Sequence, residues 1–323
     1  MTRRAMTEYA IQTIGLGRKF GRIDALCDVS MDVPTGEVVG LIGPNGAGKT
    51  TLIMLLLGIL RRSSGRALVL GRDTAEEASR IGQEIGVVLD VHGLYEGLTA
   101  LQNLQFFGQL LGLPRETAGK RGNELLRAAG LWGRRYDRVA TYSKGMKQRL
   151  AIARSLINHP RLLIMDEPLS GLDPDSLRAT KELIKQLTQS QDVTVLLSSH
   201  SLADVEELCS KVAILNRGRL VAYDTVSNLR QSKEASFIRI RLAQGQCRAS
   251  ADKALASTEG VTGHSWVAED TVQVAVAHGV QPSAILRRLA LGSIEFREAR
   301  EIGNTLEEVF LSAIGEEEEA NHR

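Results

Sequence analysis

A glycine-rich stretch, GPNGAGKTT, contains residue types that can hold a chain of phosphates. Its members are Gly43, Pro44, Asn45, Gly46, Ala47, Gly48, Lys49, Thr50 and Thr51. They satisfy the pattern G-x-x-x-x-G-K-[ST], in which glycines let the backbone curl until successive N–H groups point at phosphate oxygens. Lys49 would bind the β- and γ-phosphates, and the Thr50 hydroxyl would take one coordination site on Mg²⁺. The stretch therefore predicts that the chain binds a nucleoside triphosphate.

Two adjacent carboxylates, Asp166 and Glu167, follow the apolar run LLIM at residues 162–165. A buried strand that ends in two charges is costly unless a cation lies beside them. We expect Asp166 to face bound Mg²⁺, through a water molecule. Glu167 would then act as a general base that polarises the attacking water.

Short apolar runs alternate with longer amphipathic stretches, which predicts an α/β fold with a largely parallel sheet. A helix over residues 51–60 should follow the glycine-rich stretch. The amino terminus of this helix also favours phosphate binding. Residues 98–138 contain no strand pattern, and their apolar side chains recur at helical spacing, which indicates a helical insertion. The expected strands are residues 38–42, 67–70, 85–89, 162–166, 193–198 and 212–216.

A second domain should begin after the polar stretch near residues 230–235. Its pattern is strand, helix, strand, strand, helix, strand, which is the order of a ferredoxin-like α+β unit. We expect these elements at residues 236–242, 250–257, 261–267, 271–276, 282–291 and 294–300, followed by a closing helix at 305–314. The expected domains are therefore residues 1–230 and 235–314, and the acidic tail at 315–323 should be disordered.

Three further motifs resemble those of ABC-transporter ATPases. The run YSKGMKQR at residues 142–149 resembles the family's signature motif, LSGLD at residues 169–173 resembles its D-loop, and His200 lies where the family has its switch histidine. Phe20 lies where the family has an aromatic residue that stacks on adenine. The resemblance covers residues 8–230 and implies a P-loop NTPase domain that hydrolyses ATP with Mg²⁺, with the helical insertion spanning about residues 91–145.

The resemblance also implies how the molecule would assemble. Ser143 and Gly145 would bind the γ-phosphate of ATP held on a partner subunit, and Asp173 of the D-loop would belong to the same nucleotide site. The active unit would be a head-to-tail homodimer, or a pair with a related ATPase. His200 could hydrogen-bond the γ-phosphate and sense its loss. The transported substrate would pass through separate membrane-spanning permease subunits.

The chain departs from the family pattern at two places. Lys144 replaces a glycine of the signature and Met146 replaces its glutamine, a form that resembles exporter ATPases for drugs and antibiotics. Asp90 lies where the family usually has a glutamine that touches Mg²⁺. An aspartate can still bind this ion, so Asp90 is a candidate metal ligand. The alternative, which we favour less, is that Asp90 is a solvated loop residue.

Composition narrows the possible locations and partners. The longest apolar run, residues 52–60, is far shorter than the roughly 20 residues needed to cross a bilayer, and no apolar segment follows the amino-terminal arginines. We therefore expect a cytoplasmic protein that is peripheral on the inner face of the membrane through its permease. The net charge of +2 argues against a nucleic-acid partner.

The preferred function is the ATP-hydrolysing subunit of an exporter for a drug, antibiotic or lipid-like substrate. Three alternatives remain open. One is an importer ATPase, whose extra domain is usually all-β, and another is a regulator with low turnover, which Asp90 suggests. The third is a soluble ABC-type machine, which would need long coiled-coil heptads or a second ATPase cassette. The second domain would serve dimer stabilisation or regulation.

Overall fold

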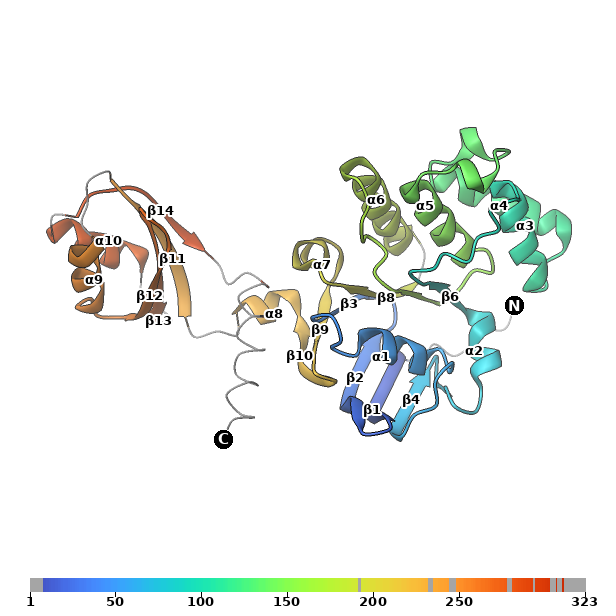
Figure 1. Ribbon diagram of the computed structural model, residues 1–323, viewed down its shortest axis with the longest axis horizontal. Helices are drawn as coiled ribbons and strands as arrows, with labels where there is room; N and C mark the ends of the chain where they lie inside the picture. The colour runs from blue at the N-terminus through green and yellow to red at the C-terminus, as the bar shows by residue number, and fades with distance from the viewer. Residues whose placement is uncertain are drawn as a thin grey trace. The chain divides into compact units, whose positions relative to one another are not determined.

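The computed structural model describes residues 8–190, 193–231, 235–243, 248–277, 281–292 and 294–302, together with Leu306 and Phe310. The chain forms two compact units, Met1–Thr225 and Val226–Arg323 (Figure 1). Within the described residues, no helix is long and apolar enough to cross a membrane.

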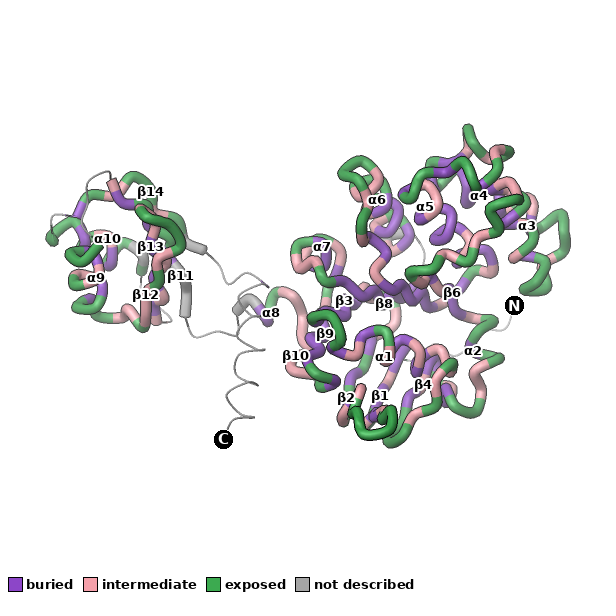
Figure 2. The backbone as a smooth tube through the Cα atoms, in the orientation of Figure 1, coloured by how far each residue is buried: buried purple, intermediate pink, exposed green. Residues whose placement is uncertain are grey.

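A six-stranded sheet organises the first unit, with the strand order β10-β9-β3-β8-β7-β6. Five strands run parallel, and β10 is antiparallel to β9 at the edge. Every residue of β7 and β8 is buried, as expected for a parallel sheet covered on both faces (Figure 2). The strands are β3 (Val38–Ile42), β6 (Ile85–Val88), β7 (Leu162–Met165), β8 (Thr194–Ser199), β9 (Lys211–Asn216) and β10 (Arg219–Thr225). The predicted parallel α/β fold is confirmed, and the ends of its five parallel strands differ from the predicted ones by at most one residue.

A second, antiparallel sheet lies in the same unit and was largely missed by the sequence patterns. Its order is β2-β1-β4-β5, and only β4 corresponds to an expected strand. In β2 the buried positions alternate with polar ones over Val29–Val33, which is typical of a strand with one face on the core. In β1 register shifts break that alternation. The strands are β1 (Tyr9–Phe20), β2 (Ile23–Pro34), β4 (Ser64–Val69) and β5 (Arg72–Asp73).

Helices fill the space around the parallel sheet. Helix α1 and the antiparallel sheet lie on one side of it, and α5 and α6 lie on the other (Figure 1). Residues 98–138 form no strand beyond one isolated bridge, as predicted. Leu111, whose helical spacing from Leu104 predicted a place on the packed apolar face, is instead 42% exposed. The helices are α1 (Lys49–Leu56), α2 (Ala78–Glu84), α3 (Ala100–Leu110), α4 (Arg115–Ala128), α5 (Lys144–Ser155), α6 (Pro174–Ser190) and α7 (Leu202–Leu208), with 3₁₀ turns η1 (Trp132–Arg134) and η2 (Val139–Thr141).

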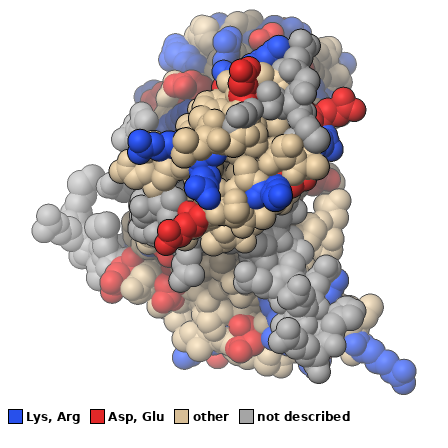
Figure 3. All heavy atoms as spheres, turned by 90° about the vertical axis from the view of Figure 1, so that its left-hand side faces the viewer, with Lys and Arg blue, Asp and Glu red and all other residues tan. Residues whose placement is uncertain are grey.

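The second unit contains a four-stranded antiparallel sheet with the order β12-β13-β11-β14. With one helix after its first strand and one after its third, this is the arrangement of a split β-α-β unit. Figure 3 shows one face of the molecule, where basic and acidic side chains are interspersed. The elements are α8 (Val226–Gln231), β11 (Ala235–Leu242), α9 (Arg248–Ala256), β12 (Val261–Ala268), β13 (Thr271–Ala277), α10 (Pro282–Leu291) and β14 (Phe296–Ile302). The expected closing helix at 305–314 and the acidic tail at 315–323 lie outside the described residues, apart from Leu306 and Phe310.

Candidate active site

Four loops meet at the carboxyl edge of the parallel sheet. Four consecutive strands of the sheet, in the order β3, β8, β7 and β6, are parallel to one another. The residues that directly follow these strands therefore leave the sheet at the same edge. In open α/β sheets this edge is where ligands bind. It therefore carries the glycine-rich loop after β3, Asp90 after β6, Asp166 and Glu167 after β7, and His200 after β8.

The glycine-rich loop joins β3 to α1 by a tight left-handed path. Gly46 and Gly48 have φ values of 81° and 104°, which side chains rarely adopt. A side chain at Gly43 would place its Cβ 2.3 Å from the carbonyl oxygen of Leu215. Helix α1 begins at Lys49 and ends at Leu56, two residues before the expected start and four before the expected end. Its free amino-terminal N–H groups therefore belong to the loop itself.

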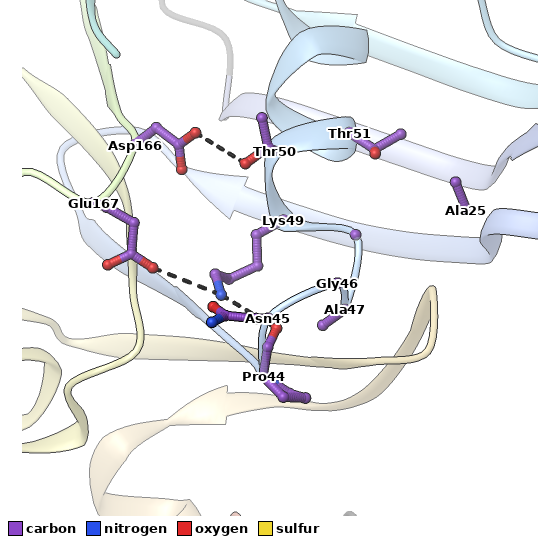
Figure 4. A pocket seen from close by; sticks show the side chains of 11 residues that line it. Ala25, Pro44, Asn45, Gly46, Ala47, Lys49, Thr50, Thr51, Asp166 and Glu167 are labelled. Carbon is purple, nitrogen blue, oxygen red and sulfur yellow. Dashed lines mark hydrogen bonds and ion pairs between the residues drawn. The ribbon is translucent and has the colours of Figure 1, made fainter. Parts of the chain in front are cut away.

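The Lys49 side chain lies along the inside of this loop (Figure 4). The residue is only 7% exposed, and its Nζ donates to the Gly43 carbonyl at 2.7 Å. The same ammonium lies 3.6 Å from Oε1 of Glu167. A buried ammonium thus faces both the loop and the carboxylate pair, where it can pair with an anionic ligand.

Asp166 links three elements through its two oxygens. The Thr50 hydroxyl at the start of α1 donates to Oδ2 at 3.0 Å, and the Ser198 hydroxyl on β8 donates to Oδ1 at 2.5 Å. Asp166 is 7% exposed, so these bonds satisfy a charge that burial would otherwise penalise. Ser198 was not predicted to take part in the site. In the sequence it is marked only by its place two residues before His200.

Glu167 is held in an unusual backbone conformation. Its φ is 49°, in the left-handed region that non-glycine residues rarely occupy. Its N–H donates to the Ser198 hydroxyl at 2.8 Å, and its Oε2 lies 2.8 Å from Nδ1 of His200. Strained backbone of this kind costs about 1–3 kcal/mol and concentrates at functional sites. The conformation directs the carboxylate toward both Lys49 and His200.

Two adjoining hollows surround these side chains. The first has a volume of about 250 Å³ and is lined by Ala25, Pro44, Asn45, Gly46, Ala47, Gly48, Lys49, Thr50, Thr51, Asp166 and Glu167. The second has a volume of about 490 Å³ and is lined by Asn45, Thr50, Asp90, Asp166, Glu167, Ser170 and His200. The structure thus brings the glycine-rich loop, both carboxylates, Asp90 and His200 together in one region.

Phe20 stands apart from both hollows. It ends β1 and is 43% exposed, with the Arg18 guanidinium 4.5 Å from its ring centroid. The exposed part of the Phe20 ring, at the end of β1, can stack on a planar ligand.

The signature-like residues Ser143 and Gly145 do not line either hollow, and Gly145 and Asp173 both lie beside Ser176. Ser143 caps α5, where its hydroxyl accepts from the Met146 N–H at 3.2 Å. A Cβ on Gly145 would lie 2.1 Å from the Ser176 hydroxyl. Asp173 accepts from the Ser176 N–H at 3.0 Å, and this bond lowers the pKa of the Asp173 carboxyl.

The donor set near Thr50 fits Mg²⁺. This ion prefers oxygen ligands and is usually held by one or two carboxylates together with substrate phosphates. The Thr50 hydroxyl and Asp166 carboxylate are already in contact, and Asp90 lines the same hollow. Among the described residues, no group of three or more His, Cys, Asp or Glu side chains could hold a metal by itself.

Comparison with known proteins agrees with this geometry. A family model described as "ABC transporter" matches residues 26–170. The daunorubicin/doxorubicin resistance ATP-binding protein DrrA of Streptomyces peucetius is 34% identical over 306 residues, which cover 95% of this chain and 92% of that protein.

Two solved structures resemble the chain in three dimensions. One is cbiO1 from Clostridium perfringens, part of the ABC transporter complex cbiONQ, with a TM-score of 0.63 and 27% identity over 68% of this chain and 89% of that one. The other is a dimeric ATP-binding cassette in a post-hydrolysis state bound to ADP and Pi, with a TM-score of 0.61 and 25% identity over 67% of this chain and 98% of that one. Because the similarity extends over nearly all of DrrA, the chain belongs to the ATP-binding proteins of ABC transporters.

Proposed function

We propose that this ABC ATPase hydrolyses Mg·ATP at a dimer interface and thereby drives export through separate membrane-spanning permease subunits. The arrangement that carries the proposal is Glu167, which lies between Lys49 and His200 beside the bonded pair Thr50 and Asp166. Such a grouping combines a phosphate cradle, a place for a hard cation and a base beside them.

Glu167 is proposed as the general base. Its carboxylate accepts a proton from a water molecule whose oxygen attacks the γ-phosphorus, while the bond from that phosphorus to the bridging oxygen breaks and ADP leaves. His200 holds Oε2 through Nδ1. The proton would go to Oε1, which lies 3.6 Å from the Lys49 ammonium in this structure. Bound Mg²⁺ would neutralise charge that develops on the phosphates, and Thr50, Asp166 and Asp90 are the residues that would hold it.

Lys49 has partners that a γ-phosphate can replace. Its ammonium donates to the Gly43 carbonyl and lies near Glu167, and a phosphate is a stronger partner than a carbonyl for this cation. When ATP binds, Lys49 transfers from Glu167 to the phosphate. The Glu167 carboxylate is thereby released to face the attacking water.

The second half of the nucleotide site is proposed to come from a partner subunit. Ser143 and Gly145 lie outside both hollows, yet α5 begins with free N–H groups and a serine hydroxyl, which suit a phosphate. The solved cassette with ADP and Pi is itself dimeric. A homodimer, or a pair with a related ATPase, would bring these groups to the phosphates that Lys49 holds.

An exposed apolar face is proposed to dock the permease. Val91, Tyr95, Phe106 and Leu110 are 83%, 50%, 41% and 69% exposed. The rings of Tyr95 and Phe106 lie 4.9 Å apart, so the segment after Asp90 and α3 meet at this face. Apolar groups gathered on a surface in this way indicate a protein contact. Docking there would place the ATPase on the inner face of the membrane.

The direction of transport is proposed from the relatives. The similar protein DrrA is a daunorubicin/doxorubicin resistance protein, which favours a drug, antibiotic or lipid-like substrate and export over import. The second unit has the strand order of a ferredoxin-like fold, and we assign it to dimer stabilisation or regulation.

The decisive experiment is a Glu167→Gln variant assayed for steady-state hydrolysis and for ATP-dependent dimerisation. We expect hydrolysis to fall by about 10²-fold or more, the usual effect of losing a general base, while ATP still binds and the dimer persists. Glu182→Gln is the matched control, because it makes the same chemical change at an exposed position of α6. Wild-type hydrolysis by Glu167→Gln would refute the assignment of the base.

The same preparation separates the alternatives. Copurification of a permease of about six spans, each of roughly 20 apolar residues, would support the exporter. ATP-dependent dimerisation without measurable wild-type turnover would point instead to a nucleotide-dependent regulator.

A further inference from the structure

One cation on α5 holds the loop that contains Asp90. Arg154 is half-buried in the last turn of α5. Its Nη1 donates to the carbonyls of His92 at 2.6 Å and Gly93 at 3.2 Å, and its Nη2 donates to the carbonyl of Val87 at 3.2 Å. One guanidinium therefore fixes the chain on both sides of Asp90, using the planar fork of donors that only arginine has.

The arrangement is costly for stability. Burial lowers the pKa of the Arg154 guanidinium, and among the residues that the structure describes no carboxylate forms an ion pair with it. A buried charge with only carbonyl partners gains little net stability, and an apolar side chain of similar size often serves a fold as well or better. What an apolar side chain cannot supply is three directed bonds to one loop. The value of Arg154 therefore lies in where it holds that loop.

Arg154 also touches the proposed docking face. Its Cζ lies 4.9 Å from the ring centroid of Phe107 on α3, and that ring lies 5.8 Å from the ring of Tyr95. The same side chain thus connects α5, which Ser143 of the signature caps, with the Asp90 loop and with the aromatic rings.

We propose that Arg154 is a positioning residue that holds residues 88–93 so that Asp90 faces the hollow shared with Thr50 and Asp166. The proposal rests on the proposed function in one respect, the role of Asp90 at bound Mg²⁺. Its structural half, that Arg154 orders the loop, does not depend on any activity.

The structural half is tested on the nucleotide-free protein by chymotrypsin. Candidate cleavage positions lie after Leu89, Leu94 and Tyr95. We expect Arg154→Gln to accelerate cleavage there by about 5-fold or more, because proteolysis follows the population of the locally open loop. Arg154→Lys should show an intermediate rate, since a compact ammonium cannot reach three carbonyls. Unchanged cleavage in Arg154→Gln would overturn the proposal.

Arg149→Gln is the matched control. Arg149 lies on the same helix, is also half-buried, and donates to a single carbonyl, that of Ala129 at 3.1 Å. The substitution removes a comparable bond far from the Asp90 loop, so cleavage after Leu89, Leu94 and Tyr95 should stay at the wild-type rate. Equal acceleration in both variants would mean a general loss of packing and would overturn the specific role of Arg154.

The metal-directed half is tested with Mn²⁺, followed by electron paramagnetic resonance, on protein loaded with a non-hydrolysable ATP analogue. Loss of a residue that orients a metal ligand typically costs 10–100-fold in metal affinity, so we expect Arg154→Gln to weaken Mn²⁺ binding by about 10-fold. In an Asp90→Asn background, Arg154→Gln should weaken Mn²⁺ binding by less than about a further 2-fold, since the two residues act together. Full additivity would overturn the link to Asp90, whereas failure of wild-type hydrolysis would count against the proposed function alone.

Discussion

Nδ1 of His200 lies 2.8 Å from Oε2 of Glu167, although the two residues follow different strands of the parallel sheet. The other carboxylate oxygen of Glu167 lies 3.6 Å from Nζ of Lys49. The carboxylate is therefore held from both sides by nitrogen groups. His200 is much the more exposed of the pair, with 60% of its side chain accessible against 22% for Glu167. An incoming phosphate can thus reach the imidazole without disturbing the sheet.

His200→Ala should lower the rate of hydrolysis without a matching loss of ATP binding. The substitution removes the group that orients Glu167, and the loss of one such preorganised group costs about 10²-fold in kcat. The rate of hydrolysis in single-turnover experiments should fall, while the Kd for ATP from equilibrium binding changes by less than about 3-fold. A parallel loss in both quantities would mean that His200 contributes mainly to binding.

Gly145→Ala should destabilise the first unit. A Cβ at this position would lie 2.1 Å from the hydroxyl and 2.3 Å from the Cβ of Ser176, so α5 and α6 must separate. Overpacking of this kind costs about 1–3 kcal/mol, which exceeds the gain of about 1 kcal/mol expected for alanine over glycine in a helix. The free energy of unfolding from urea denaturation measures the difference.

Two further variants test the cause of that loss. Ser176→Gly removes both clashing atoms and should restore most of the stability when combined with Gly145→Ala. Gly82→Ala is the control for helix propensity, because no atom lies within 4 Å of a Cβ built there. It should raise the free energy of unfolding by about 0.5–1 kcal/mol. A stable Gly145→Ala single variant would show that α6 moves away without cost.

Asp73 should make stability depend on pH in acid. The Arg62 guanidinium bonded to it at 2.5 Å lowers the pKa of this carboxyl to about 2, against about 3.9 in an unfolded chain. The folded state therefore binds this proton less readily, so the stabilisation is present above pH 4 and is lost as the pH falls from about 4 toward 2. Asp73→Asn should remove this part of the dependence. Between pH 5 and pH 3, the free energy of unfolding from urea denaturation should fall by about 1 kcal/mol more in the wild-type protein than in Asp73→Asn.

The arginine partners of Asp73 provide the comparison. Arg62→Gln should flatten the same acid window more than Arg66→Gln, because the Arg66 bond is longer at 3.2 Å and its side chain is 60% exposed. Identical pH dependence in the wild-type protein and Asp73→Asn would place the acid-sensitive carboxyl elsewhere.

The sequence predicted the parallel sheet well because both its faces are covered, so its strands are continuous apolar runs such as LLIM in β7. It missed β1 and β2 because antiparallel strands with one buried face alternate polar and apolar residues, and register shifts blur even that alternation in β1. The helix expected at residues 51–60 begins at Lys49 instead, since Gly48 itself occupies the cap position.

Part of the site could be predicted from the sequence, but its contacts could not. The glycine-rich loop and the two carboxylates follow from local patterns, His200 follows from the family resemblance, and the parallel sheet brings them to one edge. No local pattern shows that Ser198 bonds both the Asp166 carboxylate and the Glu167 N–H, because that contact depends on the pairing of β7 with β8. The left-handed backbone of Glu167 is likewise set by tertiary structure, which overrides the ordinary preference of the residue.

Phe20→Ala should weaken the binding of ATP without affecting that of tripolyphosphate. The Phe20 ring is exposed and carries the Arg18 guanidinium 4.5 Å from its centroid, and a base stacked on such a ring gains about 1–3 kcal/mol, or roughly 10-fold in Kd. Ile23→Ala is the matched control, because Ile23 is the cross-strand neighbour of Phe20 and is 69% exposed. It removes a similar apolar surface that cannot stack.

Fluorescence titration with a labelled ATP analogue, with tripolyphosphate as competitor, separates the two ends of the nucleotide. An unchanged Kd in Phe20→Ala would exclude Phe20 from adenine recognition, and equal losses with both ligands would mean that the substitution disturbs the phosphate loop.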